Sequence, residues 1–410
     1  MVKEIFRRRA VFAVAAVVVA GLVVAGCGSS SSSSSTTSTS ATTSAATAPT
    51  ISATSFTNNF SAMAALKSLA ASGKGKVAAI LPDTTSSTRY VEFDAPDLKK
   101  AAAAAGLPAS DMIVQNALGS DSTFITDAES DITNGATVLL IDPEDSGTGV
   151  TVQRYAKAHG VAVIDYDRLT LGAPQGTADY VSFNNVHVGQ LIGQGFVSCV
   201  NQWHIAKPNV VVMHGAVTDN NATLFAQGYN SVLAPYFSSG KYKLVTRTAG
   251  TWTPTDALTE FEGAYTAHSN INSAVIPNDE TGAPIIAYLR SHGVKPDTFP
   301  TTGQDATLTG LQNVLSGYQC GTVYKPIYLE AQAAVSLALY LRAGKTAPSS
   351  LVNATSTDPT NHNTVPSVLL TPEWVTPTNM QDTIVKDNFV PESQLCSGSY
   401  AADCKKYGIS

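Results

Sequence analysis

Short apolar runs alternate with longer segments of helical spacing along most of the chain. In the first half, the apolar runs cover residues 77–81, 112–114, 138–141 and 161–164. Between them, helical spacing covers residues 98–105, 124–134 and 150–159. Strands that read as continuous apolar runs are those covered by helices on both faces. The pattern therefore predicts an α/β fold with a doubly wound parallel sheet.

The same alternation returns in a second set further along the chain. Its apolar runs cover residues 210–213, 244–246 and 274–276, and its helical stretches cover 224–236, 257–267 and 283–292. The chain has 410 residues, whereas a single core stops growing at roughly 250–300 residues. We therefore expect two parallel-sheet lobes, each with its own core.

The N-terminus has the composition of an export signal. Lys3 and Arg7 to Arg9 precede an almost unbroken Ala/Val stretch over residues 11–25, which ends in small residues before Cys27. The competing interpretation is a permanent single-pass anchor, for which the run is short. The end of the run resembles the bacterial lipobox, which implies a signal peptide over residues 1–26, lipidation of Cys27, and a protein held at the outer face of the cytoplasmic membrane without spanning it.

Residues 28–50 consist almost wholly of Ser, Thr and Ala. Such a composition cannot bury enough apolar surface to offset the entropy lost on ordering. We expect the lipidated cysteine and a flexible tether to occupy residues 27–74.

With Cys27 used for lipid, four cysteines remain, an even number that favours two disulfides in an oxidising compartment. Cys396 and Cys404 are close enough in sequence to close a small loop, which leaves Cys199 with Cys320. Four cysteines allow three pairings, and spacing alone does not decide between them. No compact Cys/His pairing of a zinc site is present, so no metal is predicted.

Polar and aromatic residues follow the predicted strands, where ligands bind in open parallel sheets. These strand exits are residues 82–90, 165–168, 219–221, 252, 277–280 and 303–305. Acids and bases are balanced there, as suits the hydroxyls of a neutral sugar, and Trp252 or Tyr90 offers a flat surface for its C–H groups. In the alternative, each Asp or Asn is a helix N-cap or turn former, and Arg89 and Arg168 are surface ion-pair partners.

Charge excludes one class of partner. The net charge is −6, and no clustered Lys/Arg surface is present to neutralise phosphates, so nucleic acid is not expected to bind.

From about residue 75 to 395 the chain resembles the D-xylose-binding proteins, sugar-capturing components of ABC transporters within the ribose/galactose-type periplasmic binding proteins. The matching stretches are Asp165-Tyr166-Asp167-Arg168, Val181-Ser182-Phe183-Asn184-Asn185, Asp219-Asn220-Asn221-Ala222 followed by Leu224-Phe225, Asn278-Asp279, Gly303-Gln304-Asp305-Ala306, Thr322-Val323-Tyr324-Lys325-Pro326, and Leu369-Leu370-Thr371-Pro372.

The resemblance implies two lobes, joined by three hinge crossings, that close over a monosaccharide. Its implied boundaries are 75–183 and 322–369 for the N-terminal lobe, and 184–321 and 370–410 for the C-terminal lobe with its tail. It implies a monomer that delivers xylose or a similar aldose to a membrane permease, with no cofactor. The implied sugar contacts are Arg89, Tyr90, Arg168, Asp219, Asn221, Trp252, Asn278, Asp305 and Lys325.

Three features depart from the better-known family members. Tyr90 stands where those members have Trp, Asn184 stands where they have Asp, and the Ser/Thr-rich loop 84–88 is one residue longer. The identity of the sugar is therefore left open among pentoses and small aldoses.

Two other functions compete with transport. A glycosidase needs two flanking carboxylates, for which Asp219 and Asp305 are candidates, but no Gly-x-Ser-x-Gly motif is present and an enzyme is not expected. Residues 344–346 (Gly-Lys-Thr) lack the upstream glycine of a phosphate loop. A sugar-sensing module that presents its closed form to a membrane sensor remains open.

Overall fold

The computed structural model describes residues 49–409, which belong to one compact unit. Its first lobe is built on a seven-stranded sheet with the order β10-β11-β5-β4-β3-β1-β2. The strands are β1 (Lys76–Leu81), β2 (Met112–Asn116), β3 (Ala136–Ile141), β4 (Ala162–Tyr166), β5 (Asp179–Phe183), β10 (Ala354–Thr357) and β11 (Thr364–Leu370). All neighbours pair in parallel except β10 with β11.

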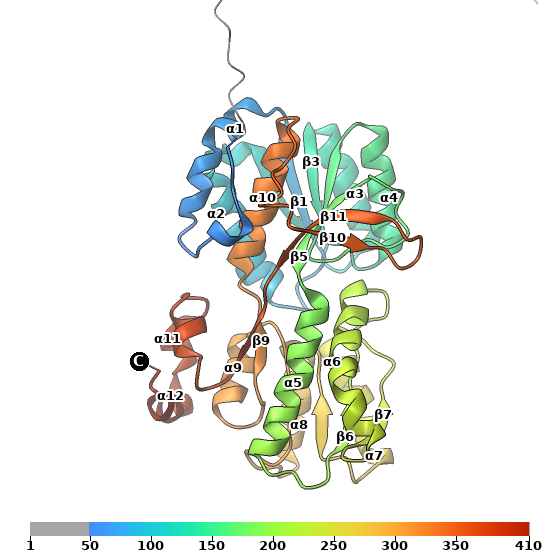
Figure 1. Ribbon diagram of the computed structural model, residues 1–410, viewed down its shortest axis with the longest axis vertical. Helices are drawn as coiled ribbons and strands as arrows, with labels where there is room; N and C mark the ends of the chain where they lie inside the picture. The colour runs from blue at the N-terminus through green and yellow to red at the C-terminus, as the bar shows by residue number, and fades with distance from the viewer. Residues whose placement is uncertain (1–48, 410) are drawn as a thin grey trace, which may run out of the picture. The chain divides into compact units, whose positions relative to one another are not determined.

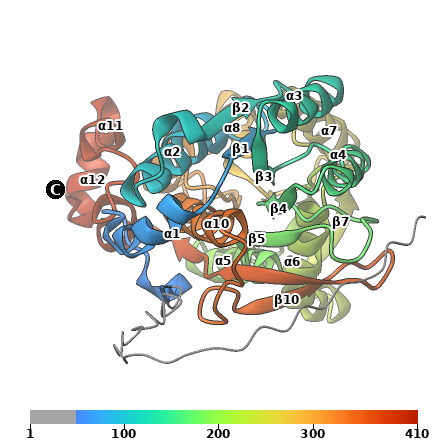
Figure 2. The same cartoon turned by 90° about the horizontal axis from the view of Figure 1, so that it is seen from above.

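Helices cover both faces of this sheet, as the apolar runs predicted. Val77, Ala79 and Leu81 of β1 share a core with α2 (Ala95–Ala104) and α10 (Ile327–Arg342). Ala78 and Ile80 point to the other face, which α3 (Asp121–Thr133) and α4 (Ser146–Ala158) cover. Figure 2 shows α2 and α10 on one side of these strands and α3 and α4 on the other. The predicted doubly wound α/β fold is confirmed.

The second lobe contains a three-stranded parallel sheet with the order β7-β6-β8. The strands are β6 (Asn209–Val212), β7 (Lys243–Arg247) and β8 (Ser273–Val275). One face packs on α5 (Asn185–Gln202) and α6 (Asn220–Ser238), and the other packs on α7 (Pro254–Ala267) and α8 (Asp279–Ser291). Helix α9 (Leu308–Leu315) and the antiparallel pair β9 (Thr322–Tyr324) and β12 (Glu373–Val375) complete it.

The chain passes between the lobes three times. The passages lie between β5 and α5, between β9 and α10, and between β11 and β12, and Figure 1 shows them side by side. Each passage is only a few residues long, so the two lobes lie close together. The carboxyl ends of the strands of both lobes face a common space.

Residues 51–72 correct the expectation of a tether reaching residue 74. They form η1 (Ala53–Ser55), η2 (Ser61–Leu66) and α1 (Lys67–Ser72). Phe60, Met63 and Leu66 are buried in the first-lobe core with α2 and α10. The apolar side chains of this segment fill the groove left by those helices, so it belongs to the folded body. The predicted signal peptide, Cys27 and residues 28–48 of the predicted tether lie outside the described residues.

The C-terminal segment after β12 is also folded. It forms η5 (Gln381–Val385), α11 (Glu392–Leu395), η6 (Gly398–Tyr400) and α12 (Ala401–Tyr407). The side chain of Asp387 accepts hydrogen bonds from the hydroxyls of Tyr324 (3.0 Å) and Tyr328 (2.8 Å).

Within residues 49–409, no helix is both long and apolar enough to cross a membrane.

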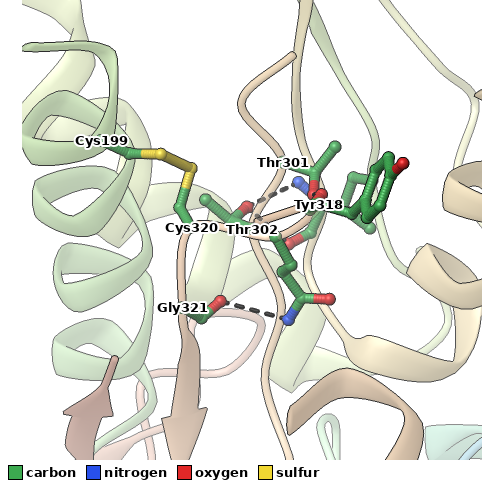
Figure 3. Close-up of a disulfide and its surroundings, with 8 residues drawn as sticks. Cys199, Thr301, Thr302, Tyr318, Cys320 and Gly321 are labelled. Atoms are coloured by element: carbon green, nitrogen blue, oxygen red, sulfur yellow. Dashed lines mark hydrogen bonds between the residues drawn. A yellow bond between two sulfur atoms is a disulfide. The ribbon is translucent and has the colours of Figure 1, made fainter. Parts of the chain in front are cut away.

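Both disulfides have the pairing that the short-loop argument favoured. Cys396 bonds to Cys404, 8 residues away, and Cys199 bonds to Cys320, 121 residues away. The second of these ties α5, where the chain enters the second lobe, to the segment just before β9, where it leaves (Figure 3). The backbone N–H of Cys320 also donates to the carbonyl of Thr301 at 2.9 Å.

Candidate ligand-binding site

A cavity lies between the two lobes at the carboxyl ends of their strands. The cavity is narrow, with a volume of only about 30 Å³ for the centres of water-sized molecules. Its lining residues are Ser86, Ser87, Arg89, Tyr90, Asp167, Arg168, Asp219, Asn221, Phe225, Trp252, Asn278, Gln304, Asp305 and Lys325. All nine residues predicted to contact a ligand are among them. Their role in binding stays a prediction, but the structure brings them together.

Arg89 is held rigidly at the floor of the cavity. Its guanidinium donates to Asp94 (2.8 and 2.7 Å), Glu330 (2.6 Å) and Asp167 (3.0 Å). The side chain is 2% exposed, so the alternative of a surface ion-pair partner is wrong for this residue. Buried cations are stable when several carboxylates satisfy them, and here three do.

Asp167 carries negative charge into the same region. Its carboxylate lies 3.0 Å from Arg89 and 3.8 Å from Lys325. Burial opposes ionisation, but the surrounding cations outweigh it and hold the pKa of Asp167 at about 2. The residue therefore presents an ionised acceptor at the cavity wall.

Tyr90 is fixed between two guanidinium groups. Its ring centre lies 5.4 Å from Arg89 and 5.7 Å from Arg168, and its hydroxyl accepts from Arg168 at 3.0 Å. Arg168 is also buried, so it too is not a surface residue. Arg168 lies 3.5 Å from Asp219 of the second lobe, and this ion pair spans the cavity.

Asp219 and Asn278 start helices of the second lobe and also face the cavity. Asp219 accepts from the backbone N–H of Asn221 at 2.8 Å as the N-cap of α6, while Asn278 accepts from Thr281 at 3.0 Å as the N-cap of α8. The N-cap interpretation is therefore confirmed for both residues, and their contact with a ligand stays a prediction. Capping fixes the side chains in place, which favours a preformed site.

Trp252 supplies an aromatic surface from the second lobe. Its indole N–H donates to Asp219 at 3.0 Å, and its ring meets Phe225 edge-to-face at 6.4 Å. A Cβ at Gly215 would lie 2.2 Å from the indole, so only glycine allows the ring to lie there. The ring is 8% exposed and is therefore fixed at the cavity rather than free in a loop.

Beside the hinge, a carboxylate oxygen of Asp305 lies 3.3 Å from the ammonium nitrogen of Lys325. Asp305 has a φ of +93°, an uncommon backbone conformation for a residue with a side chain, and its N–H donates to Val323 at 2.9 Å. The amide oxygen of the adjacent residue, Gln304, is buried and makes no hydrogen bond with any residue in the described range. An unsatisfied buried acceptor at a cavity wall indicates a place for a ligand hydroxyl.

The nine predicted contacts leave out five of the lining residues: Ser86, Ser87, Asp167, Phe225 and Gln304. Four of them lie in the strand exits identified from the sequence, so the segments were found but these side chains were not singled out. Phe225 lies on α6, outside those exits. Among residues 49–409, no group of three or more His, Cys, Asp or Glu is arranged to hold a metal ion.

The two lobes and the polar cavity between them define the class of protein to which the chain belongs. A family model described as a periplasmic binding protein domain matches residues 77–346. The chain belongs to this family of periplasmic binding proteins.

Within the family, the chain is similar to sugar-binding members. It is 37% identical over 286 residues to the D-xylose-binding periplasmic protein of Escherichia coli, a match that covers 69% of this chain and 83% of that protein. It is 30% identical over 344 residues to a multiple sugar-binding periplasmic receptor of Rhizobium radiobacter, which covers 79% of this chain and 93% of the receptor.

A solved structure is similar to this chain over most of its length. The solute-binding protein of an ABC transporter from Clostridium phytofermentans, with bound β-D-glucose, is 26% identical, with a TM-score of 0.69. The match covers 78% of this chain and 99% of that one.

Proposed function

We propose that the protein is the substrate-binding component of a sugar ABC transporter. It captures one monosaccharide, with D-xylose the first candidate, and presents the closed form to a membrane permease. The observation that carries the proposal is the convergence of nine polar and aromatic residues from both lobes on one cavity. The sugar-binding relatives support it, and their periplasmic location supports a site of action outside the cytoplasm.

The chemistry of the cavity suits a neutral, hydroxyl-rich ligand. The cations Arg89, Arg168 and Lys325 each face a carboxylate within 3.5 Å, which offsets the positive charge that an anionic ligand would need. Ionised acceptors and amides remain to bind hydroxyls, and Trp252 and Tyr90 can contact ring C–H groups from opposite lobes.

Both candidate carboxylates of a glycosidase already have partners. Asp219 accepts from Trp252 and Asn221, while Asp305 accepts from Ser87 and pairs with Lys325. These contacts favour hydroxyl recognition over general acid–base work. We therefore propose binding and release without turnover.

The direct test is calorimetric titration of residues 49–410 with xylose, arabinose, ribose, glucose and galactose. One-to-one binding of one sugar is expected. Trp252→Ala and Asp305→Ala should each weaken binding by more than about 1 kcal/mol, because a buried partner loses its contact. Glu262→Gln, a change on α7 away from the cavity, is the matched control. No binding to any sugar, or wild-type affinity in both cavity variants, would overturn the proposal.

Membrane attachment through Cys27 is part of the proposed function. Incorporation of a labelled fatty acid into the wild-type chain, and its loss in Cys27→Ser, is the expected result. Labelling that survives the substitution would reject it.

A further inference from the structure

The two lobes touch directly at a place beside the cavity, through a side chain that does not line it. One carboxylate oxygen of Glu280 in the second lobe, Oε1, lies within hydrogen-bond distance of three donors of the first lobe, one of which, the Ser87 hydroxyl, it shares with Asp305. The donors are the backbone N–H of Thr88 (2.8 Å), the hydroxyl of Ser87 (3.0 Å) and the hydroxyl of Thr88 (3.3 Å). Beside them, the amide of Asn278 donates to the carbonyl of Ser86 at 3.1 Å.

The position of Glu280 is fixed by its own helix. Asn278 caps α8, and Glu280 is the second residue of that helix. The other carboxylate oxygen of Glu280, Oε2, accepts from the Asn278 amide at 3.2 Å. A carboxylate in the first turn is stabilised by the helix dipole. These contacts within the second lobe hold the side chain toward the first lobe.

On the first lobe, the contact falls at the start of the helix that carries two cavity residues. The carbonyl of Thr88 accepts from the N–H groups of Val91 and Glu92, and the helical segment begins at Arg89. Glu280 accepts the N–H of Thr88, one of the donors that a helix start leaves without a partner. A carboxylate from the opposite lobe therefore caps the helix that positions Arg89 and Tyr90.

The contact is also joined to the cavity. The hydroxyl of Ser87 lies 3.0 Å from Glu280 and 2.9 Å from Asp305, which pairs with Lys325. A hinge movement that separates the lobes breaks all the hydrogen bonds between residues 86–88 and the second lobe together.

We propose that Glu280 is a positioning residue that latches the closed lobes through residues 86–88 and so limits the rate of ligand release. The inference rests on the proposed function and adds to it the group that controls the dwell time of the closed form. Burial, with Asp305 and Asp279 nearby, raises the pKa of Glu280 well above its usual value. Glu280→Gln keeps a side-chain oxygen that can accept from residues 86–88, although its amide nitrogen cannot accept from Asn278 as Oε2 does.

The test compares Glu280→Ala, Glu280→Gln and wild type as full-length chains purified in detergent. Stopped-flow tryptophan fluorescence, with the sugar identified by calorimetry, gives the association and dissociation rate constants. Glu280→Ala should raise the dissociation rate constant about tenfold, since three hydrogen bonds are lost, and leave the association rate constant within about twofold. Glu280→Gln should stay within about threefold of wild type in both.

Glu262→Gln and Glu262→Ala are the matched controls. Glu262 lies on α7 of the same lobe and makes no side-chain hydrogen bond or ion pair with any residue between 49 and 409. A dissociation rate constant for Glu280→Ala within about twofold of wild type would overturn the latch. So would a loss of affinity caused entirely by slower association.

A second measurement separates failure of the latch from failure of the proposed function. Small-angle X-ray scattering of the ligand-free chain reports the separation of the lobes without any sugar. Glu280→Ala should have a larger radius of gyration than wild type and Glu280→Gln. If wild type binds no sugar but this difference persists, the proposed function fails and the latch stands. Equal radii in all three chains, together with unchanged release where sugar binds, would reject the latch alone.

Discussion

Removing the two disulfides separately should destabilise the second lobe by different amounts. A disulfide stabilises the fold mainly by restricting the unfolded chain, and the effect grows with the length of the loop that it closes. The Cys199–Cys320 bond spans 121 residues, which corresponds to about 5 kcal/mol. The Cys396–Cys404 bond spans 8 residues, which corresponds to about 2.5 kcal/mol.

The two pairs form a matched comparison. Each contains one buried cysteine, Cys199 at 3% and Cys404 at 2% exposure, and one that is partly exposed. Replacing both members of a pair by Ala therefore removes a similar amount of packing in each case. The difference between the two double variants isolates the loop-length term, which should be about 2.5 kcal/mol.

Tryptophan fluorescence is the appropriate assay, because all three tryptophans of the chain lie in the second lobe. Trp203 ends α5, Trp252 follows β7, and Trp374 lies in β12. Guanidinium titrations followed by fluorescence should show the larger loss of unfolding free energy in Cys199→Ala with Cys320→Ala. Equal losses, or a larger loss in the short-loop variant, would refute the loop-length reasoning.

Three further changes test other parts of the structure. Gly215→Ala should displace the ring of Trp252 and weaken sugar binding about tenfold by calorimetry, since such an aromatic contact is worth about 1–1.5 kcal/mol; unchanged affinity would contradict the site geometry. Burial raises the pKa of Asp165 to about 7 from its usual 3.8, so its protonated form stabilises the folded state at low pH. That contribution is lost progressively as pH rises from about 4 to about 7, by up to about 1.4 kcal/mol per pH unit. Urea titrations of Asp165→Asn from pH 4 to 8 should lack this slope, and an unchanged slope would contradict the reasoning. Gly228→Ala should lower the unfolding free energy by about 1–3 kcal/mol, because its Cβ would lie 2.2 Å from the backbone oxygen of Val186 where α5 and α6 meet; a melting temperature equal to that of wild type would show that the helices separate without cost.

Local sequence determined the fold class. Continuous apolar runs such as 77–81 place alternate residues on opposite faces, and both faces are buried, so helices must cover both sides. Strand exits then identified where polar residues gather, because the connectivity of a parallel sheet brings those exits to one edge. Lys325 lies outside that reasoning, and the family resemblance supplied it.

Only the tertiary structure decided which side chains work together. The apolar side chains within residues 51–72 are buried partly by α10, which lies far away in the sequence, so the composition of the segment did not reveal that it is folded. Arg89 is neutralised by Glu330, 241 residues away, and Thr88 meets Glu280 across 192 residues. The sequence by itself determined the strands, the helices and the chemical types at the cavity, because those depend on neighbours along the chain. The partners of each charge, and the contact that closes the lobes, depend on packing between distant segments, which no local pattern specifies.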